Sequence, residues 1–283
     1  ALRNRAVFAF SDTISLYLTS KGVKSMASTG ASAVRGITQF GQVEWDTRVE
    51  LAACYRIFDY LGWTELIYNH ITLRVPGPEK HFLINPFGLH YSEVTASNLV
   101  KIDLDGNPVG DSDYPVNLAG YVIHSAVHRH REDAHCIMHT HTTAGMAVAC
   151  LEEGLTYDNF MAAFLPDVAY HDFQGVTVDR AEQDDLVNSL GQSNALILRS
   201  HGLLSCGPTV AKAFSTLWTL ERACQIQLAT HSMNKAVLPL PEKAFQRSAD
   251  LSNIDKKSAY NPEQMVLDWL RREIDKRDPS YAT

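Results

Sequence analysis

Hydrophobic positions along the chain follow two spacings, one helical and one extended. In 45–62, apolar residues recur every three or four positions up to Gly62, which predicts a helix that ends at a glycine. The same spacing predicts further helices over 117–131, 179–190, 209–230 and 263–276. Short apolar runs predict strands over 70–75, 81–86, 134–141 and 194–202, while 93–110 indicates a helix start followed by a strand. This interleaving predicts an α/β fold with one sheet covered by helices.

The pattern divides the chain into three parts. Residues 45–236 carry the regular alternation and are predicted to form the main domain. Residues 1–44 are rich in Ser and Thr, and up to residue 40 Asp12 is the only acid, so an N-terminal arm is expected, with a transit segment as the less favoured alternative. Residues 237–283 are expected to form a C-terminal extension that contains an amphipathic helix.

Composition narrows the possible functions. The net charge of −7 argues against nucleic acid as a partner, because phosphate binding requires a clustered basic surface. No apolar run approaches the roughly 20 residues that span a bilayer, so no membrane partner is expected. The five cysteines are widely spaced and read as reduced thiols, which predicts a cytoplasmic protein. Nucleotide-binding glycine loops and the serine-hydrolase G-x-S-x-G motif are both missing from the sequence.

The strongest chemical signal is the pair His139 and His141 at the end of an apolar strand. Residues two apart in a strand point to the same face, so both imidazoles can reach one point. His201 closes a second predicted strand and precedes Gly202, which permits a sharp turn. Three histidines from two neighbouring strand ends would form a catalytic metal site with open positions. If the strands are not neighbours, these histidines are surface or core residues.

Several stretches together resemble the class II aldolase and adducin superfamily. They are LGWTELIYNHITLRVPG, NPFGLHYSEVTASNLVKIDLDGNPV, HCIMHTHTTAGMAVA, PDVAYHDFQG and LILRSHGLLSCGPTVAKAF, in unbroken order between about 47 and 232. EVTASNLVKIDLDG and DVAYHDFQG are closer to the adducin head domain and its bacterial relatives than to the sugar-phosphate aldolases. The resemblance implies a three-layer α/β/α domain with a central mixed sheet, and a homotetramer. It also implies one divalent metal per chain, zinc first and iron or manganese as alternatives, bound by His139, His141 and His201.

The sequence departs from the aldolases at their acid/base residue. The aldolase glutamate matches Gly120, and a glycine cannot transfer a proton. His124 lies one helical turn further along and is a candidate replacement base or a fourth ligand, with a role in orienting another residue as the equal alternative. His128 and His130 lie in the polar run HRHRED and are predicted to be on the surface.

The phosphate-binding positions also differ. The family's small hydrogen-bond donors match Tyr68-Asn69, Phe87-Gly88 and Leu118-Ala119, so a phosphorylated substrate is not expected. By this correspondence Asn69, Phe87, Gly88 and Gly120 are candidate substrate-binding residues. Tyr170 is, with His124, a candidate catalytic residue at the pocket mouth, although a structural role is the more common one for a buried tyrosine.

Three functions remain open on the sequence. The first is a metal-dependent lyase that cleaves a carbon–carbon bond of an unphosphorylated, aromatic or carboxylated small molecule, with decarboxylation favoured over aldol cleavage because the glutamate is missing. The second is an oxygenase that holds iron or manganese at the same three histidines. The third is a non-catalytic, adducin-like assembly module, against which stands the retention of all three histidines.

Overall fold

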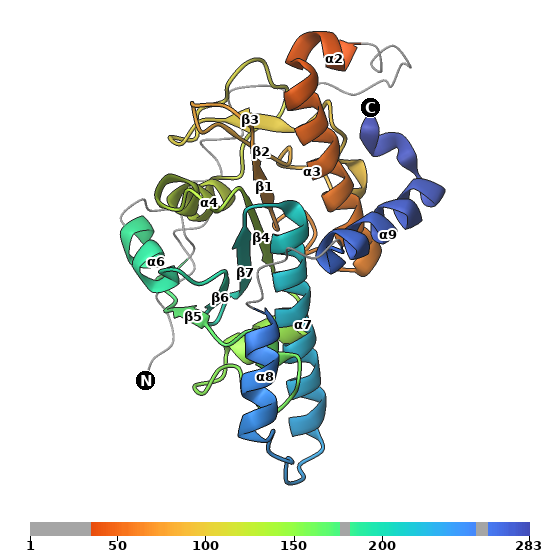
Figure 1. Cartoon of the computed structure of the whole chain (residues 1–283). Coiled ribbons are helices and arrows are strands. Elements are labelled where there is room, and N and C mark those ends of the chain that lie inside the picture. The colour runs from red at the N-terminus through yellow and green to blue at the C-terminus, as the bar shows by residue number, and fades with distance from the viewer. Residues whose placement is uncertain (1–34, 176–181, 253–259) are drawn as a thin grey trace.

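A computed structural model describes residues 35–175, 182–252 and 260–283 (Figure 1). Its helices are α2 (Arg35–Phe40), α3 (Gln42–Leu61), α4 (Leu118–His130), α5 (Thr143–Ala149), α6 (Glu182–Leu190), α7 (Val210–Ser232), α8 (Glu242–Ser252) and α9 (Pro262–Arg277). Its strands are β1 (Ile71–Arg74), β2 (Phe82–Ile84), β3 (Val100–Ile102), β4 (Cys136–Thr140), β5 (Val168–His171), β6 (Ala195–Leu198) and β7 (Gly202–Gly207). Short 3-10 turns lie at Tyr91–Glu93, Ala162–Phe164 and Pro279–Ala282. Most of the expected N-terminal arm, residues 1–34, lies outside the described residues.

The seven strands form one mixed sheet in the order β3-β2-β1-β4-β7-β6-β5. β5 and β6 run parallel, and every other neighbouring pair is antiparallel. The predicted α/β fold is thereby confirmed. The sequence analysis missed β7, which begins at Gly202 and pairs with both β4 and β6, and it also missed α5 and α8.

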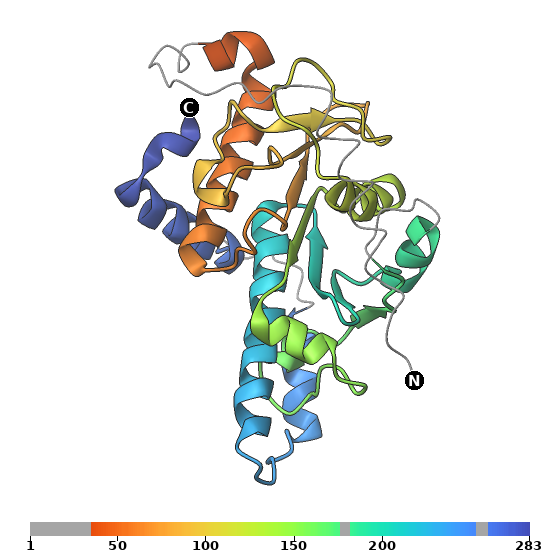
Figure 2. The same cartoon turned by 180° about the vertical axis from the view of Figure 1, so that it is seen from behind.

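Helices cover both faces of the sheet and make three layers (Figure 1). On one face α3, α5 and α7 pack over residues such as Ile71, Met138 and Leu203, and α9 packs against α3 and α7. On the other face α4 and α6 pack over Ile137 and Leu204. The view from behind shows the same separation, with α7 extending beyond the sheet alongside α8 (Figure 2).

Alternation along β1 and β4 sends side chains to opposite layers. Met138 points to the α3 and α7 layer, whereas Ile137 points to the α4 and α6 layer, so His139 also faces α4. Thr72 in β1 contacts α4 as well, through hydrogen bonds to two of its histidines. Polar groups of β1 and of α4 therefore meet in the buried layer between them.

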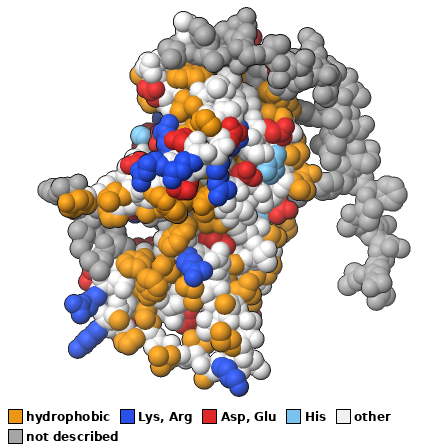
Figure 3. Space-filling model, turned by 90° about the vertical axis from the view of Figure 1, so that its right-hand side faces the viewer, with side chains coloured by type: hydrophobic (Ala, Val, Ile, Leu, Met, Phe, Trp, Pro, Cys, Tyr) orange, Lys and Arg blue, Asp and Glu red, His pale blue; other side chains and the backbone are white. Residues whose placement is uncertain are grey.

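One face of the molecule shows how charged and hydrophobic side chains are distributed over the described residues (Figure 3). Seen from the right-hand side of Figure 1, charged side chains of both signs gather in the upper part and hydrophobic ones spread below them (Figure 3). Among the described helices, none has the length and apolar character needed to cross a bilayer.

Candidate metal centre

The candidate metal-binding histidines lie at one end of the sheet. β4 ends there with His139 and Thr140, β7 begins there, and the tight turn between β6 and β7 carries His201. This turn is stabilised by a backbone bond from His201 N to Leu198 O at 3.0 Å, and it places Ser200 at a φ of +56°. Pairing of Thr140 with Leu203 brings the two strand ends together, which the sequence alone left open.

Within the described residues, His139, His141 and His201 form a group whose ligand atoms all lie within 4.8 Å of one another. The Nε2 atoms of His139 and His141 are 2.7 Å apart. The ring of His201 lies 4.8 Å from that of His139 and 4.9 Å from that of His141, measured between centroids. The donor set is three imidazole nitrogens, which fits a divalent metal with open coordination positions.

Two features of the backbone hold this group in place. His139 Nδ1 donates to the carbonyl of Leu203 at 2.8 Å, which leaves Nε2 with a lone pair for a metal. A Cβ at Gly202 would collide with the carbonyl oxygen of Thr140 and come within 3.1 Å of His141 Cδ2 and 3.3 Å of His139 Cε1. Glycine is therefore required at position 202 for the strands to approach closely.

The three histidines are held in their neutral form. Burial, followed by the neighbouring imidazoles, lowers the pKa of His139 well below its usual range. Burial also lowers the pKa of His141, and it lowers the pKa of His201 to about 4. Neutral imidazole is the form that binds a metal, so these three side chains are in a form that could hold one.

A fourth histidine beside this group escaped the sequence analysis. His70 immediately precedes β1, is 2% exposed, and its ring centroid lies 5.1 Å from that of His139. A Cβ at Gly120 would lie 2.7 Å from His70 Cδ2 and 2.8 Å from Cγ. His70 therefore occupies the space next to the position that matches the aldolase glutamate. Its place directly after Asn69, a candidate site residue, was the available signal.

His124 does not face the three-histidine group directly. Its ring is fully buried, with Nε2 2.9 Å from His70 Nδ1 and Nδ1 2.8 Å from Thr72 Oγ1. It thus contacts the site through His70. The prediction that His128 lies on the surface was wrong, because this ring is also fully buried and contacts Thr72 Oγ1 at 2.8 Å. His130 is exposed, as predicted.

Of the remaining candidate residues, Asn69 contacts the three-histidine group directly, and the others lie in neighbouring segments. Asn69 is buried and donates from Nδ2 to the His139 carbonyl at 3.3 Å, while its Oδ1 has no partner among the described residues. Phe87 is half-buried and Gly88 is exposed, in the segment after β2. The Tyr170 hydroxyl accepts a bond from Leu155 N at 3.0 Å, which ties it to the loop beyond α5.

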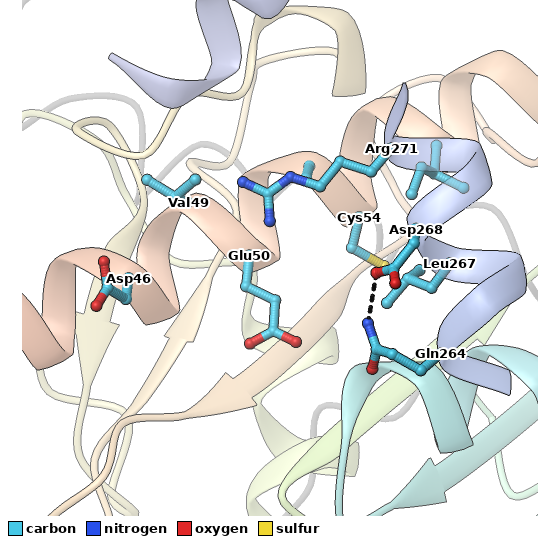
Figure 4. Close-up of a pocket in the computed structure, with 10 residues that line it drawn as sticks. Asp46, Val49, Glu50, Cys54, Gln264, Leu267, Asp268 and Arg271 are labelled. Atoms are coloured by element: carbon cyan, nitrogen blue, oxygen red, sulfur yellow. Dashed lines mark hydrogen bonds between the residues drawn. The ribbon is translucent and has the colours of Figure 1, made fainter. Parts of the chain in front are cut away.

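Two cavities are found among the described residues, one beside His201 and one away from the three histidines. A recess of about 10 Å³ beside His201 is lined by His171 at the end of β5, Glu182 at the start of α6 and residues that follow β5 and β6. A cavity of about 320 Å³ lies instead between α3 and α9, with Glu50 of α3 and Arg271 of α9 among the residues that line it (Figure 4). Burial raises the pKa of Glu50, and Arg271 opposes this shift. This cavity is separate from the three-histidine group and is not part of the candidate centre.

Comparison with known proteins gives one consistent result. A family model described as "Class II Aldolase and Adducin N-terminal domain" matches residues 49–228. Mouse alpha-adducin is 51% identical over 186 residues, which are 65% of this chain and 25% of that protein. The crystal structure of an aldolase II superfamily protein from Pseudomonas syringae superposes with a TM-score of 0.83 at 40% identity, covering 89% of this chain and all of the other. L-fuculose 1-phosphate aldolase from Glaciozyma antarctica reaches 0.72 at 27% identity, covering 90% and 96%.

Proposed function

The chain belongs to the class II aldolase and adducin family, and from that membership we propose that it is a metal-dependent lyase that cleaves a carbon–carbon bond. The single observation that carries the proposal is the convergence of His139, His141 and His201 from two paired strands. Class II aldolases use a divalent metal, typically zinc, and three neutral imidazoles fit zinc with positions left for a substrate. We assign these three residues as the metal ligands.

The bound metal would supply Lewis-acid stabilisation of negative charge on a substrate oxygen. The protein's own residues do the rest. The Leu203 carbonyl orients His139, and Gly202 allows the strands to approach. Asn69 offers its unpartnered Oδ1 to a substrate hydroxyl, and His70 provides a polar group in the space beside Gly120. His124 acts by holding His70.

The substrate we propose is an unphosphorylated oxo or hydroxy acid, or an aromatic analogue. At the positions where the resemblance aligns the small phosphate-binding residues of the aldolases, this chain has Tyr68, Phe87 and Leu118. Tyr68 is 53% exposed and Leu118 is 46% exposed, so both present apolar surface. Phe87, Gly88 and Gly120 would line the substrate space, whereas Tyr170 packs on the opposite face of the sheet, against the cluster that includes Ile197. Either decarboxylation or aldol cleavage fits this arrangement, and we propose a homotetramer as the assembly.

Metal content is the first test. The protein purified without chelator and analysed by elemental mass spectrometry should hold about one zinc per chain, and His139→Ala should lose it because one of three ligands is gone. His135→Ala is the matched control, since His135 is exposed just before the same strand and should keep the metal. The zinc-loaded protein should then decarboxylate or cleave members of a panel of unphosphorylated oxo and hydroxy acids in preference to sugar phosphates.

Other results would contradict the proposal in different ways. Iron or manganese at the same ratio, with oxygen consumed in the presence of a substrate, would indicate an oxygenase. A metal-free protein that binds no added zinc would indicate an assembly module. Full metal content in His139→Ala would overturn the ligand assignment itself.

A further inference from the structure

We infer that a buried chain of hydrogen bonds fixes which nitrogen of His70 carries the proton, so that His70 presents an unprotonated nitrogen beside the three-histidine group. The chain runs from the carbonyl of Ala134 through His128, Thr72 and His124 to His70. Its geometry is independent of the reaction, whereas its catalytic role rests on the proposed lyase function.

The first link fixes His128. Its Nδ1 lies 3.1 Å from the Ala134 carbonyl oxygen, which can only accept, so Nδ1 must carry the hydrogen. Burial, followed by the charge of Arg74, lowers the pKa of His128 to about 3, so the ring is neutral. Nε2 therefore has no hydrogen and accepts one from Thr72 Oγ1, 2.8 Å away.

The donor and acceptor roles in the next two hydrogen bonds follow from the first. A threonine hydroxyl has one proton, and Thr72 gives it to His128, so Thr72 must accept from His124 Nδ1 at 2.8 Å. Burial, followed by the neighbouring imidazoles, lowers the pKa of His124 well below its usual range, so His124 is neutral and its Nε2 carries a lone pair. That lone pair accepts from His70 Nδ1 at 2.9 Å.

His70 then has its hydrogen on Nδ1 and a lone pair on Nε2. The reverse direction would require the Ala134 carbonyl to donate a hydrogen, which it cannot do. Any protonated ring in the chain would place an uncompensated charge in a fully buried layer.

The position of His70 would allow its Nε2 lone pair to accept a hydrogen bond from a substrate. The ring lies next to His139 and fills the space over Gly120, and its remaining free nitrogen can accept a hydrogen bond from a substrate hydroxyl. His70 is therefore the group that touches substrate, and His124, Thr72 and His128 are positioning residues that act through it. A substrate with a hydroxyl donor fits this site better than one with acceptors alone.

Nitrogen NMR of the histidine side chains tests the inference directly. In the zinc-loaded protein labelled with ¹⁵N-histidine, the His70 signals are identified by their loss in His70→Gln. We expect a protonated Nδ1 and an unprotonated Nε2 for His70. Thr72→Val removes the hydroxyl that links His124 to His128, and the ratio of the two His70 tautomers should fall by about tenfold, the equivalent of one hydrogen bond.

Thr47→Val is the matched control, because the Thr47 side chain is largely buried and its hydroxyl bonds within α3, to Val43 O at 2.8 Å. It should leave the His70 signals unchanged. A hydrogen on Nε2 of His70 in the unaltered protein would overturn the inference even if Thr72→Val fails to fold. A folded Thr72→Val protein with an unchanged tautomer ratio would also overturn it. The predicted tautomer in a protein without lyase activity would support the inference and contradict the proposed function.

Discussion

Replacing Gly120 with alanine gives a sharp test of whether His70 and Gly120 share one space. In the intact site the new Cβ would lie 2.7 Å from His70 Cδ2 and 2.8 Å from Cγ. Cγ is close to the backbone, and the ring is held by His124, so the ring cannot swing aside without breaking its 2.9 Å hydrogen bond. Overpacking of this kind costs about 1–3 kcal/mol.

Helix propensity acts in the opposite direction. Gly120 lies in the first turn of α4, where alanine would gain up to about 1 kcal/mol over glycine. The net expectation is that Gly120→Ala destabilises the protein by about 1–2 kcal/mol. In a His70→Ala background the obstructing atoms are gone, so the same change should be neutral or stabilising by up to about 1 kcal/mol.

The assay is a double-mutant cycle of urea unfolding on the four proteins. Midpoints are compared at unchanged slope, first at one fixed free zinc concentration and then in chelator, because metal binding adds to the stability of the native state. The loss of the His124 partner is common to both His70→Ala proteins and cancels in the cycle. We expect a coupling energy of about 1–3 kcal/mol and a change of sign in the alanine effect. A Gly120→Ala effect that is the same in both backgrounds would refute the packing argument.

Three further predictions concern other parts of the centre and its support. Gly202→Ala should weaken zinc binding at least about tenfold in competition with a chromophoric chelator, because the new Cβ displaces the strand that carries two ligands; unchanged affinity would contradict the close approach. Burial raises the pKa of Glu221 above its ordinary 4.5, so its native form favours the proton and stability should fall as pH rises from 4.5 through the raised value; Glu221→Gln should flatten that slope in unfolding midpoints measured across this range. Arg131→Lys should cost about 1–3 kcal/mol, because lysine cannot satisfy the carbonyls of Gly191 and Ser193 and the Asn194 side chain together as the guanidinium does; a loss below about 0.5 kcal/mol in urea unfolding would refute this.

The sequence was most informative where a pattern is local. Helical spacing predicted α3, α4, α7 and α9 with ends within about three residues, because the turns of a helix contact residues three and four positions away. The period of two in a strand placed His139 and His141 on one face. His201 joined them by its position at the end of a predicted strand, and the structure brings all three together.

Tertiary structure alone decided how distant segments meet. Nothing local showed that β7 lies between β4 and β6, because strand pairing depends on hydrogen bonds between segments far apart in the chain. The prediction that His128 is exposed failed for a related reason: the polar run HRHRED marks a surface, yet Thr72 and Ala134 O provide hydrogen-bonding partners that make burial of this ring favourable. In the sequence, Gly120 was interpreted as the loss of a glutamate. Only the fold shows that the absence of a side chain at Gly120 makes room for His70, fifty positions earlier in the chain. Sequence thus identified the three histidines as candidate ligands, while packing between β1, β4 and α4 determined what surrounds them.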